Sequence, residues 1–217
     1  MKKIVITKAG GPEVLAIQDF PELQPANGEV RIAVKAAGLN FADILARLGL
    51  YRDAPKFPCT VGYEVSGIVD AVSPTVDASW LGKEVFALTR FKGHAEQVVV
   101  RVNQLFEKPA SLSFEQAAAI PVNYLTAYQL LIVMGGLKSH DTILIHNAGG
   151  GVGLAALEFA NHIGAETFGT ASSGKHTFLK GRGLHHAIDY RNQDWKAELL
   201  KLTNQRGVDL IIDPIGG

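Results

Sequence analysis

The segment from Thr142 to Ala156 constrains the fold most, because an apolar run, a glycine-rich turn and an apolar helical pattern follow one another there. That order is typical of the first strand, turn and helix of a dinucleotide-binding unit. Ala148, Gly150 and Gly153 fit an A-x-G-x-x-G fingerprint, which lets the backbone approach a pyrophosphate and lets helix and strand pack closely. A glycine-rich turn without a ligand is the alternative. The candidate cradle comprises Asn147, Ala148, Gly150, Gly151, Val152 and Gly153.

The next expected strand, 166–170, indicates which dinucleotide would bind. An NAD-binding unit carries an acidic residue about 20 positions beyond the glycines, where it bonds the ribose 2′-hydroxyl. Here the chain has Ser172, Ser173 and Lys175 instead. Two hydroxyls and an ammonium suit a ribose 2′-phosphate through charge-assisted hydrogen bonds, so the sequence predicts NADP(H). In the alternative interpretation Ser172 caps the following helix and Lys175 is a solvated surface lysine.

Composition narrows the class of protein. With 217 residues, of which 47% are hydrophobic, the chain can form one large or two ordinary domains with proper cores. The formal net charge is zero and no polybasic run occurs, so we expect neither nucleic acid nor a membrane surface as a partner. The N-terminus has no signal-peptide pattern, and we expect a cytoplasmic protein.

Cysteine and histidine usage predicts a protein without a metal. The single cysteine, Cys59, excludes internal disulfides and a multi-cysteine zinc lobe. We interpret it as a small buried residue rather than a nucleophile, because no general base stands near it in the sequence. The seven histidines show no metal-ligand spacing.

The chain divides into halves with different patterns. From Lys3 to about Lys108, short β-type runs alternate with turn residues, and six of the nine prolines fall between them, which predicts a β-rich domain with one short helix from Asn40. The expected strands in this half cover 4–6, 14–17, 30–34, 65–69, 84–88 and 97–100. We place the domains at 1–120 and 121–217.

From about Ser113 the pattern lengthens into helices and then alternates as βαβαβαβ, which predicts a parallel sheet covered on both faces. The expected helices are 113–119, 122–134, 152–163, 174–181 and 193–203, and the expected strands are 142–146, 166–170, 186–189 and 208–212. A doubly wound dinucleotide sheet has six strands in the order 3-2-1-4-5-6. We therefore expect a sheet cut after its fourth strand, with an open edge there and about a hundred further residues in the parent polypeptide.

Several segments together resemble the zinc-free quinone oxidoreductase branch of the medium-chain dehydrogenase/reductase superfamily. The match runs along almost the whole chain and rests on Ala36–Asp43, Gly49–Tyr51, Gly62–Val69, Thr126–Tyr128, Asn147–Gly153 and Asp213–Gly217. The resemblance implies a GroES-like β-rich substrate domain, then a doubly wound Rossmann domain, here truncated after four strands. It also implies a homodimer for the full-length protein.

Two departures from the zinc-dependent relatives bear on the chemistry. Asn40 stands where those relatives have a cysteine ligand, and Tyr63 stands where they have a histidine ligand. With two of three protein ligands missing, a catalytic zinc cannot be held. A simple ketone is hard to activate without a Lewis acid, whereas a quinone or an enone spreads the arriving negative charge to a distant oxygen. The expected reaction is therefore NADPH-dependent reduction of a quinone or an α,β-unsaturated carbonyl.

The resemblance and the chemistry of the side chains suggest roles in the first domain. Asn40 could orient the acceptor or the nicotinamide ribose, and Tyr51 could donate to the acceptor oxygen; a helix N-cap and an exposed loop aromatic are the respective alternatives. Phe41, Asp43 and Tyr63 are expected to line the substrate pocket. Tyr63 is interpreted as a wall rather than an acid, because a phenol pKa near 10 makes proton donation slow.

In the second domain, Thr126 resembles a residue that lies against the nicotinamide, with a plain helical threonine as the alternative. Tyr190 resembles a residue beside the adenosine phosphate. Two other functions stay open: a non-catalytic NADPH-binding protein of the same fold, and an inactive fragment of the enzyme.

Overall fold

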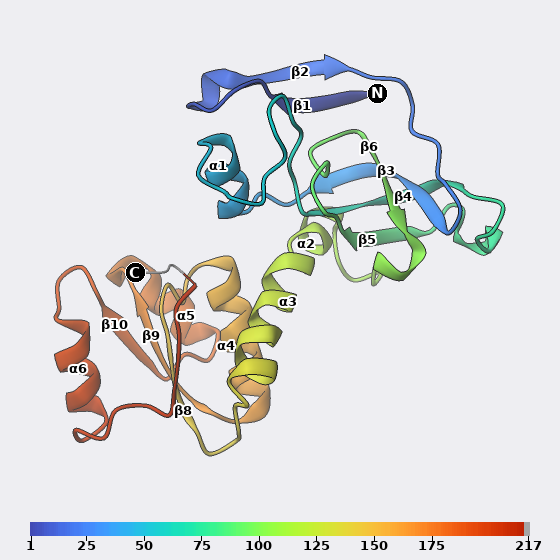
Figure 1. Cartoon of the computed structure of the whole chain (residues 1–217). Coiled ribbons are helices and arrows are strands. Elements are labelled where there is room, and N and C mark those ends of the chain that lie inside the picture. The colour runs from blue at the N-terminus through green and yellow to red at the C-terminus, as the bar shows by residue number, and fades with distance from the viewer. Residues whose placement is uncertain (215–217) are drawn as a thin grey trace. The chain divides into compact units, whose positions relative to one another are not determined.

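The chain divides into two units (Figure 1). The first unit, Met1–Val122, is built on antiparallel strands. The computed structural model describes residues 1–214. In the first unit, five strands pair in the order β6-β3-β4-β5-β7. These strands are β3 (Glu29–Ala37), β4 (Glu64–Val72), β5 (Glu84–Leu88), β6 (Gln97–Arg101) and β7 (Leu105–Glu107). The β-rich domain predicted from the sequence is confirmed, although β7 was not among the expected strands.

A hairpin and several short helical elements complete this unit. The hairpin pairs β1 (Lys2–Ile6) with β2 (Leu15–Asp19), and a 3₁₀ turn at Pro12–Val14 precedes β2. The sequence placed Val14 in the strand, but Val14 is buried in this turn because Pro12 opens it and fixes the backbone. The two α-helices are α1 (Phe41–Arg47) and α2 (Phe114–Ala118).

Alternating apolar residues form the core of the five-stranded sheet. Every second side chain on a strand points to the same face, so one face can be fully apolar. The buried cluster comprises Val30, Ile32, Val65, Val69, Val85, Ala87, Val98, Val100 and Leu105. The Ser66 hydroxyl, also on β4, donates to the carbonyl oxygen of Phe114 and so fixes the first residue of α2 to the sheet.

The second unit, which starts at Asn123, contains a parallel sheet in the order β10-β9-β8-β11. Numbered along the chain, this is the 3-2-1-4 order that the sequence predicts for the first four strands of a dinucleotide-binding sheet. The strands are β8 (Thr142–Ile145), β9 (Glu166–Ala171), β10 (His186–Asp189) and β11 (Leu210–Ile212). Helix α3 (Pro121–Tyr128) begins two residues before this unit, which also contains α4 (Gly151–Ile163), α5 (His176–Gly181) and α6 (Trp195–Leu202).

Both faces of the parallel sheet are buried. Ile143 and Ile145 pack with Leu157 of α4 on one face. Leu144, between them, packs with Phe168 and Leu199 on the other face, which α6 covers. The continuous apolar run that dominated the sequence of β8 is the pattern expected for a strand buried on two sides.

The helix predicted at 122–134 is not uniform. After Tyr128 the backbone changes to a π-helical turn at Gln129–Met134. Its backbone hydrogen bonds include one from Gly135 N to Leu130 O, at 3.0 Å, which spans five residues and widens the turn. A Cβ atom at Gly135 would lie 2.8 Å from the backbone oxygen of Leu130, so the end of the widened turn favours a glycine.

Two further boundaries differ from the sequence prediction. The segment predicted as a helix from 174 begins as a 3₁₀ turn, Ser173–Lys175, before α5. The strand predicted at 208–212 begins only at Leu210, because Gly207 turns the chain with a φ of 79° and Val208 packs with the α6 side of the core. The end of the family resemblance, 215–217, lies outside the described residues. None of the helices in residues 1–214 has the length and apolarity needed to cross a bilayer.

Gly153 sets the distance between helix α4 and the turn after β8. A Cβ atom there would lie 2.3 Å from Asn147 O and 2.8 Å from Ala148 Cα, and backbone atoms cannot move aside as a flexible side chain can. Gly174 provides the contrast, since a Cβ atom there would meet nothing within 4 Å.

We predict that Gly153→Ala lowers the free energy of unfolding of the second unit by about 1–3 kcal/mol through overpacking. The control Gly174→Ala should change it by less than about 0.5 kcal/mol. Urea unfolding followed by far-UV circular dichroism measures both. Equal stability of the two variants would contradict the close approach at Gly153.

Candidate functional site

The glycine turn after β8 is fixed to the neighbouring strand. Ala148 N donates to Thr170 O at 3.0 Å, and Asn147 N donates to the Thr170 hydroxyl at 3.2 Å. Asn147 adopts a left-handed backbone with a φ of 50°, which asparagine tolerates better than most residues. Gly150 is the N-cap of α4. The first-turn N–H groups of α4, which have no acceptor within the helix, therefore lie at the carboxyl end of the sheet.

Side chains from elsewhere in this unit occupy the space that the glycines leave. A Cβ atom at Gly149 would lie 2.6 Å from Lys175 Cδ, and one at Gly151 would lie 2.4 Å from Asn123 Oδ1. The Lys175 ammonium donates to Gly149 O at 3.2 Å. The structure thus brings Lys175 to the glycine turn, beside the cradle that the sequence predicts.

The serines after β9 lie in the short turn before α5. Ser172 occupies an N-cap position, but its hydroxyl makes no capping hydrogen bond, so the capping interpretation of this serine is not supported. Ser173 is exposed. Hydrogen bonds from the Asn192 amide and the Arg191 N–H hold the pKa of Asp189 below its ordinary value, and the Ser173 hydroxyl adds to this effect.

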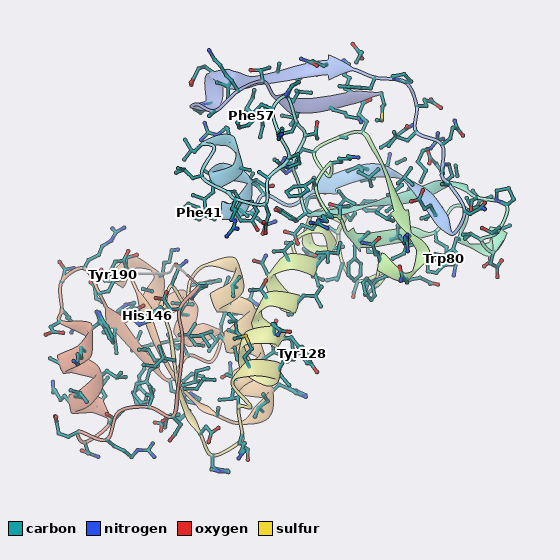
Figure 2. All side chains as sticks on the ribbon, in the orientation of Figure 1. Phe41, Phe57, Trp80, Tyr128, His146 and Tyr190 are labelled. Atoms are coloured by element: carbon teal, nitrogen blue, oxygen red, sulfur yellow. The ribbon has the colours of Figure 1, made fainter. Side chains whose placement is uncertain are left out.

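Tyr190 follows β10 and is half exposed. Figure 2 shows it at the same end of the parallel sheet as His146. Arg191 Nε donates to the Tyr190 hydroxyl at 3.4 Å, which adds a cation that the sequence argument did not single out. Thr126 lies partly buried in α3.

His146 and Asn123 are further polar residues that the sequence argument missed. His146 Nδ1 lies 3.1 Å from the Thr170 hydroxyl, and its ring meets Trp195 edge-on at 4.7 Å. His146 could have been found from its place at the end of the first parallel strand. The position of Asn123 beside Gly151 depends on the tertiary fold, and no local pattern indicates it.

In the first unit, Asn40 is held by two acidic side chains. It is the N-cap of α1, as the sequence suggested, and its backbone N–H donates to Asp43 Oδ2 at 2.9 Å. Its side-chain Nδ2 donates to Glu64 Oε1, also at 2.9 Å. Glu64 is buried, and burial raises the pKa of its carboxyl group, although the hydrogen bonds from Val122 and Asn40 oppose that rise.

Asp43 is almost fully buried, and much of its hydrogen-bonding capacity serves the backbone. Its Oδ1 accepts from Gly62 N at 3.0 Å, and its Oδ2 accepts from Asn40 N. It also borders a cavity of about 770 Å³ inside this unit, together with Arg47 and His94. His94 Nε2 lies 3.0 Å from Gly38 O and therefore donates to it.

The aromatic candidates of the first unit differ in exposure. Phe41 projects from the start of α1 and is 70% exposed (Figure 2). The rings of Tyr51 and Tyr63 meet edge-on at 6.3 Å, and Phe91 packs on the other side of Tyr63 at 5.0 Å. Burial, together with the neighbouring Tyr51 hydroxyl, raises the pKa of the Tyr63 phenol. Such a shift makes Tyr63 a poorer proton donor near neutral pH, in line with its interpretation as a wall.

Within residues 1–214, no three histidine, cysteine, aspartate or glutamate side chains are grouped as a metal site would require. Burial raises the pKa of the Cys59 thiol, which disfavours the thiolate that binds metals. Asn40 and Tyr63, which stand where the zinc-dependent relatives have ligands, make a hydrogen bond to Glu64 and ring contacts with Tyr51 and Phe91, respectively.

Family models match both units. The alcohol dehydrogenase GroES-like domain matches residues 26–124, and the zinc-binding dehydrogenase domain matches residues 151–217. Among curated proteins, the synaptic vesicle membrane protein VAT-1 homolog of Danio rerio is 42% identical over 219 residues, covering 100% of this chain and 45% of that protein. The rat protein of the same name is 41% identical, with 54% of its length covered. The chain thus spans about half the length of the curated relatives it matches.

Solved structures agree with this fold. A quinone oxidoreductase of Pseudomonas syringae superposes with a TM-score of 0.92 at 37% identity, covering 100% of this chain and 67% of that one. The CurK enoyl reductase gives a TM-score of 0.93 at 33% identity, covering 100% and 68%. A mycobacterial protein whose structure is complexed with NADPH gives 0.91 at 32% identity, again covering 100% and 68%.

The hydroxyl of Tyr63 is expected to destabilise the first unit. Among the described residues this hydroxyl is buried without a hydrogen-bond partner, which carries a desolvation cost. Tyr63→Phe should therefore raise the free energy of unfolding by about 1 kcal/mol. Chemical denaturation measures the change, with the half-exposed Tyr128→Phe as the matched control. A loss of stability in Tyr63→Phe beyond that of the control would show that the hydroxyl is bonded.

Proposed function

Because the chain belongs to the medium-chain dehydrogenase/reductase superfamily, in its zinc-free quinone oxidoreductase branch, we propose that it binds NADP(H) and reduces a quinone or an α,β-unsaturated carbonyl. The observation that carries the proposal is the Lys175 ammonium at the glycine turn. It places a cation beside the cradle, at the end of a strand that carries no acidic residue there.

The residues present suit such a cofactor. A Cβ atom at Gly149 or Gly151 would meet the side chain of Lys175 or Asn123, so glycines let these polar groups lie against the turn. The start of α4 directs N–H groups to its end, where a pyrophosphate binds favourably. Lys175, Ser172 and Ser173 would hold the 2′-phosphate through charge-assisted hydrogen bonds. Tyr190 would lie beside the adenosine. When bound, the cofactor supplies the hydride.

The first unit would supply the groups that act on the acceptor. Asn40 carries a neutral amide that can donate to an oxygen, and Tyr51 carries a hydroxyl that is partly exposed. Neutral donors stabilise a charge that spreads over a conjugated system more readily than one concentrated on a single alkoxide. Phe41 and Tyr63 would form apolar walls. The names of two structural neighbours, a quinone oxidoreductase and an enoyl reductase, support this substrate class.

A second candidate is an NADPH-binding protein that does not catalyse hydride transfer. It is favoured by the 42% identity to a relative that is named as a vesicle membrane protein. In either case we propose a small-molecule ligand rather than nucleic acid or a membrane as the partner, a cytoplasmic location and a homodimer in the full-length protein.

Lys175→Glu tests the cofactor assignment. It should weaken NADPH binding by roughly 1.5–3 kcal/mol, about 10- to 150-fold, while leaving NADH binding nearly unchanged. Lys180→Glu makes the same change of charge on the exposed side of α5 and is the matched control. Fluorescence titration gives the dissociation constants. Equal affinities of the unaltered protein for NADPH and NADH would refute the 2′-phosphate assignment.

Hydride transfer separates the two candidate functions. We expect NADPH oxidation with quinones and enones, slower turnover with simple ketones, and no response to chelators. The decrease in nicotinamide absorbance across a substrate panel measures it, with NADPH affinity determined on the same preparation. Tight NADPH binding without oxidation by any acceptor would favour the non-catalytic candidate, and activity lost together with stoichiometric zinc would contradict the metal-free chemistry.

A further inference from the structure

Glu64, the first residue of β4, is 1% exposed. The chain between β3 and α1 passes directly over its side chain, because a Cβ atom at Gly38 would lie 2.2 Å from Glu64 Oε1 and 2.5 Å from its Cγ. A carboxyl group buried this deeply needs hydrogen-bond donors to offset its lost hydration. The residues that donate to Glu64 therefore show which parts of the chain its carboxyl group holds together.

Each oxygen of Glu64 has its own donor. Oε1 accepts from Asn40 Nδ2 at 2.9 Å, and Oε2 accepts from the backbone N–H of Val122 at 2.8 Å. Val122 lies in the first turn of α3, where a backbone N–H has no acceptor within the helix. One side chain thus connects the N-cap of α1 to the start of α3.

This arrangement dictates which way the Asn40 amide faces. A carboxylate oxygen can only accept, so Asn40 must turn its NH₂ group to Glu64. The carbonyl oxygen and the second N–H of that amide are then fixed in direction as well. Asp43 holds the backbone of the same residue, so backbone and side chain of Asn40 are both constrained.

We propose that Glu64 is a positioning residue, whose carboxylate orients the Asn40 amide for the hydride acceptor. The inference rests on the proposed function, in which Asn40 touches that acceptor. Glu64 itself acts only through Asn40 and through the start of α3.

Glu64→Gln tests the orientation with little change of shape. In the variant, the backbone N–H of Val122 would donate to the only carboxamide oxygen of the glutamine. The glutamine NH₂ group would then face Asn40. Asn40 must then present its carbonyl oxygen, so the hydrogen bonds are retained while the Asn40 amide is reversed. Ser66→Ala is the matched control, since it removes another buried hydrogen bond of β4 without touching Asn40.

We expect Glu64→Gln to lower kcat by about 10- to 100-fold, the range found when supporting groups of a site are altered. Its thermal stability should stay near that of Ser66→Ala. In an Asn40→Ala background the same substitution should cause no further loss of kcat. An equal loss with and without Asn40 would overturn the proposal, because Glu64 would then act independently of the amide.

NMR of the Asn40 side-chain amide tests the orientation directly, because it can be measured on the unaltered protein and does not depend on activity. In the unaltered protein, one amide proton bonded to a buried carboxylate should resonate downfield and exchange slowly. Glu64→Gln should shift both signals. Amide signals like those of a solvated asparagine would overturn the orientation even in an active enzyme. Bonded amide signals without hydride transfer would instead contradict the proposed function and leave the orientation intact.

Discussion

The burial of one carboxyl group, Glu64, is the constraint on which the candidate substrate residues depend. A buried carboxylate is tolerated only where donors replace water, and here the donors come from Asn40 and Val122. The chain before α1 must carry a glycine at position 38 to pass over the group. The hydrogen bonds of the Glu64 carboxyl group therefore connect the Asn40 segment and the start of α3 to the first residue of β4.

In the second unit the corresponding constraint is steric. Gly153 lets α4 begin against the backbone of Asn147 and Ala148, while Thr170 of β9 holds the turn from the side. The same close approach that packs helix on strand brings the N-terminus of α4 to the carboxyl end of the parallel sheet. The proposed cofactor preference rests on a separate feature, the Lys175 side chain, whose ammonium donates to Gly149 O of this turn.

Periodicity and turn residues were sufficient to predict most strands, the alternation of strands and helices after Ser113 and the helix start at Asn40, because these depend on local patterns. The 3-2-1-4 strand order followed from the glycine fingerprint of the dinucleotide-binding fold. The π-helical turn at Gln129–Met134 was missed, since the apolar pattern of 122–134 does not distinguish such a turn from a regular helix. For the candidate site, the sequence indicated Asn40 and Lys175 as residue types. It could not show that the Asn40 amide bonds Glu64, because the partners are 24 residues apart and no spacing rule connects them.

Glu64 also bears on the electrostatics of the proposed reaction. An acceptor that receives hydride beside Asn40 becomes negative, and a carboxylate one side chain away would oppose that charge. The hydrogen bonds from Asn40 and Val122 disperse part of the carboxylate's negative charge, although burial raises the pKa of the group. A conjugated acceptor lessens the conflict further, because its charge moves to an oxygen distant from the carbon that is reduced. If Asn40 contacts the acceptor as proposed, the buried acid that orients its amide would therefore favour acceptors with delocalised charge over simple ketones.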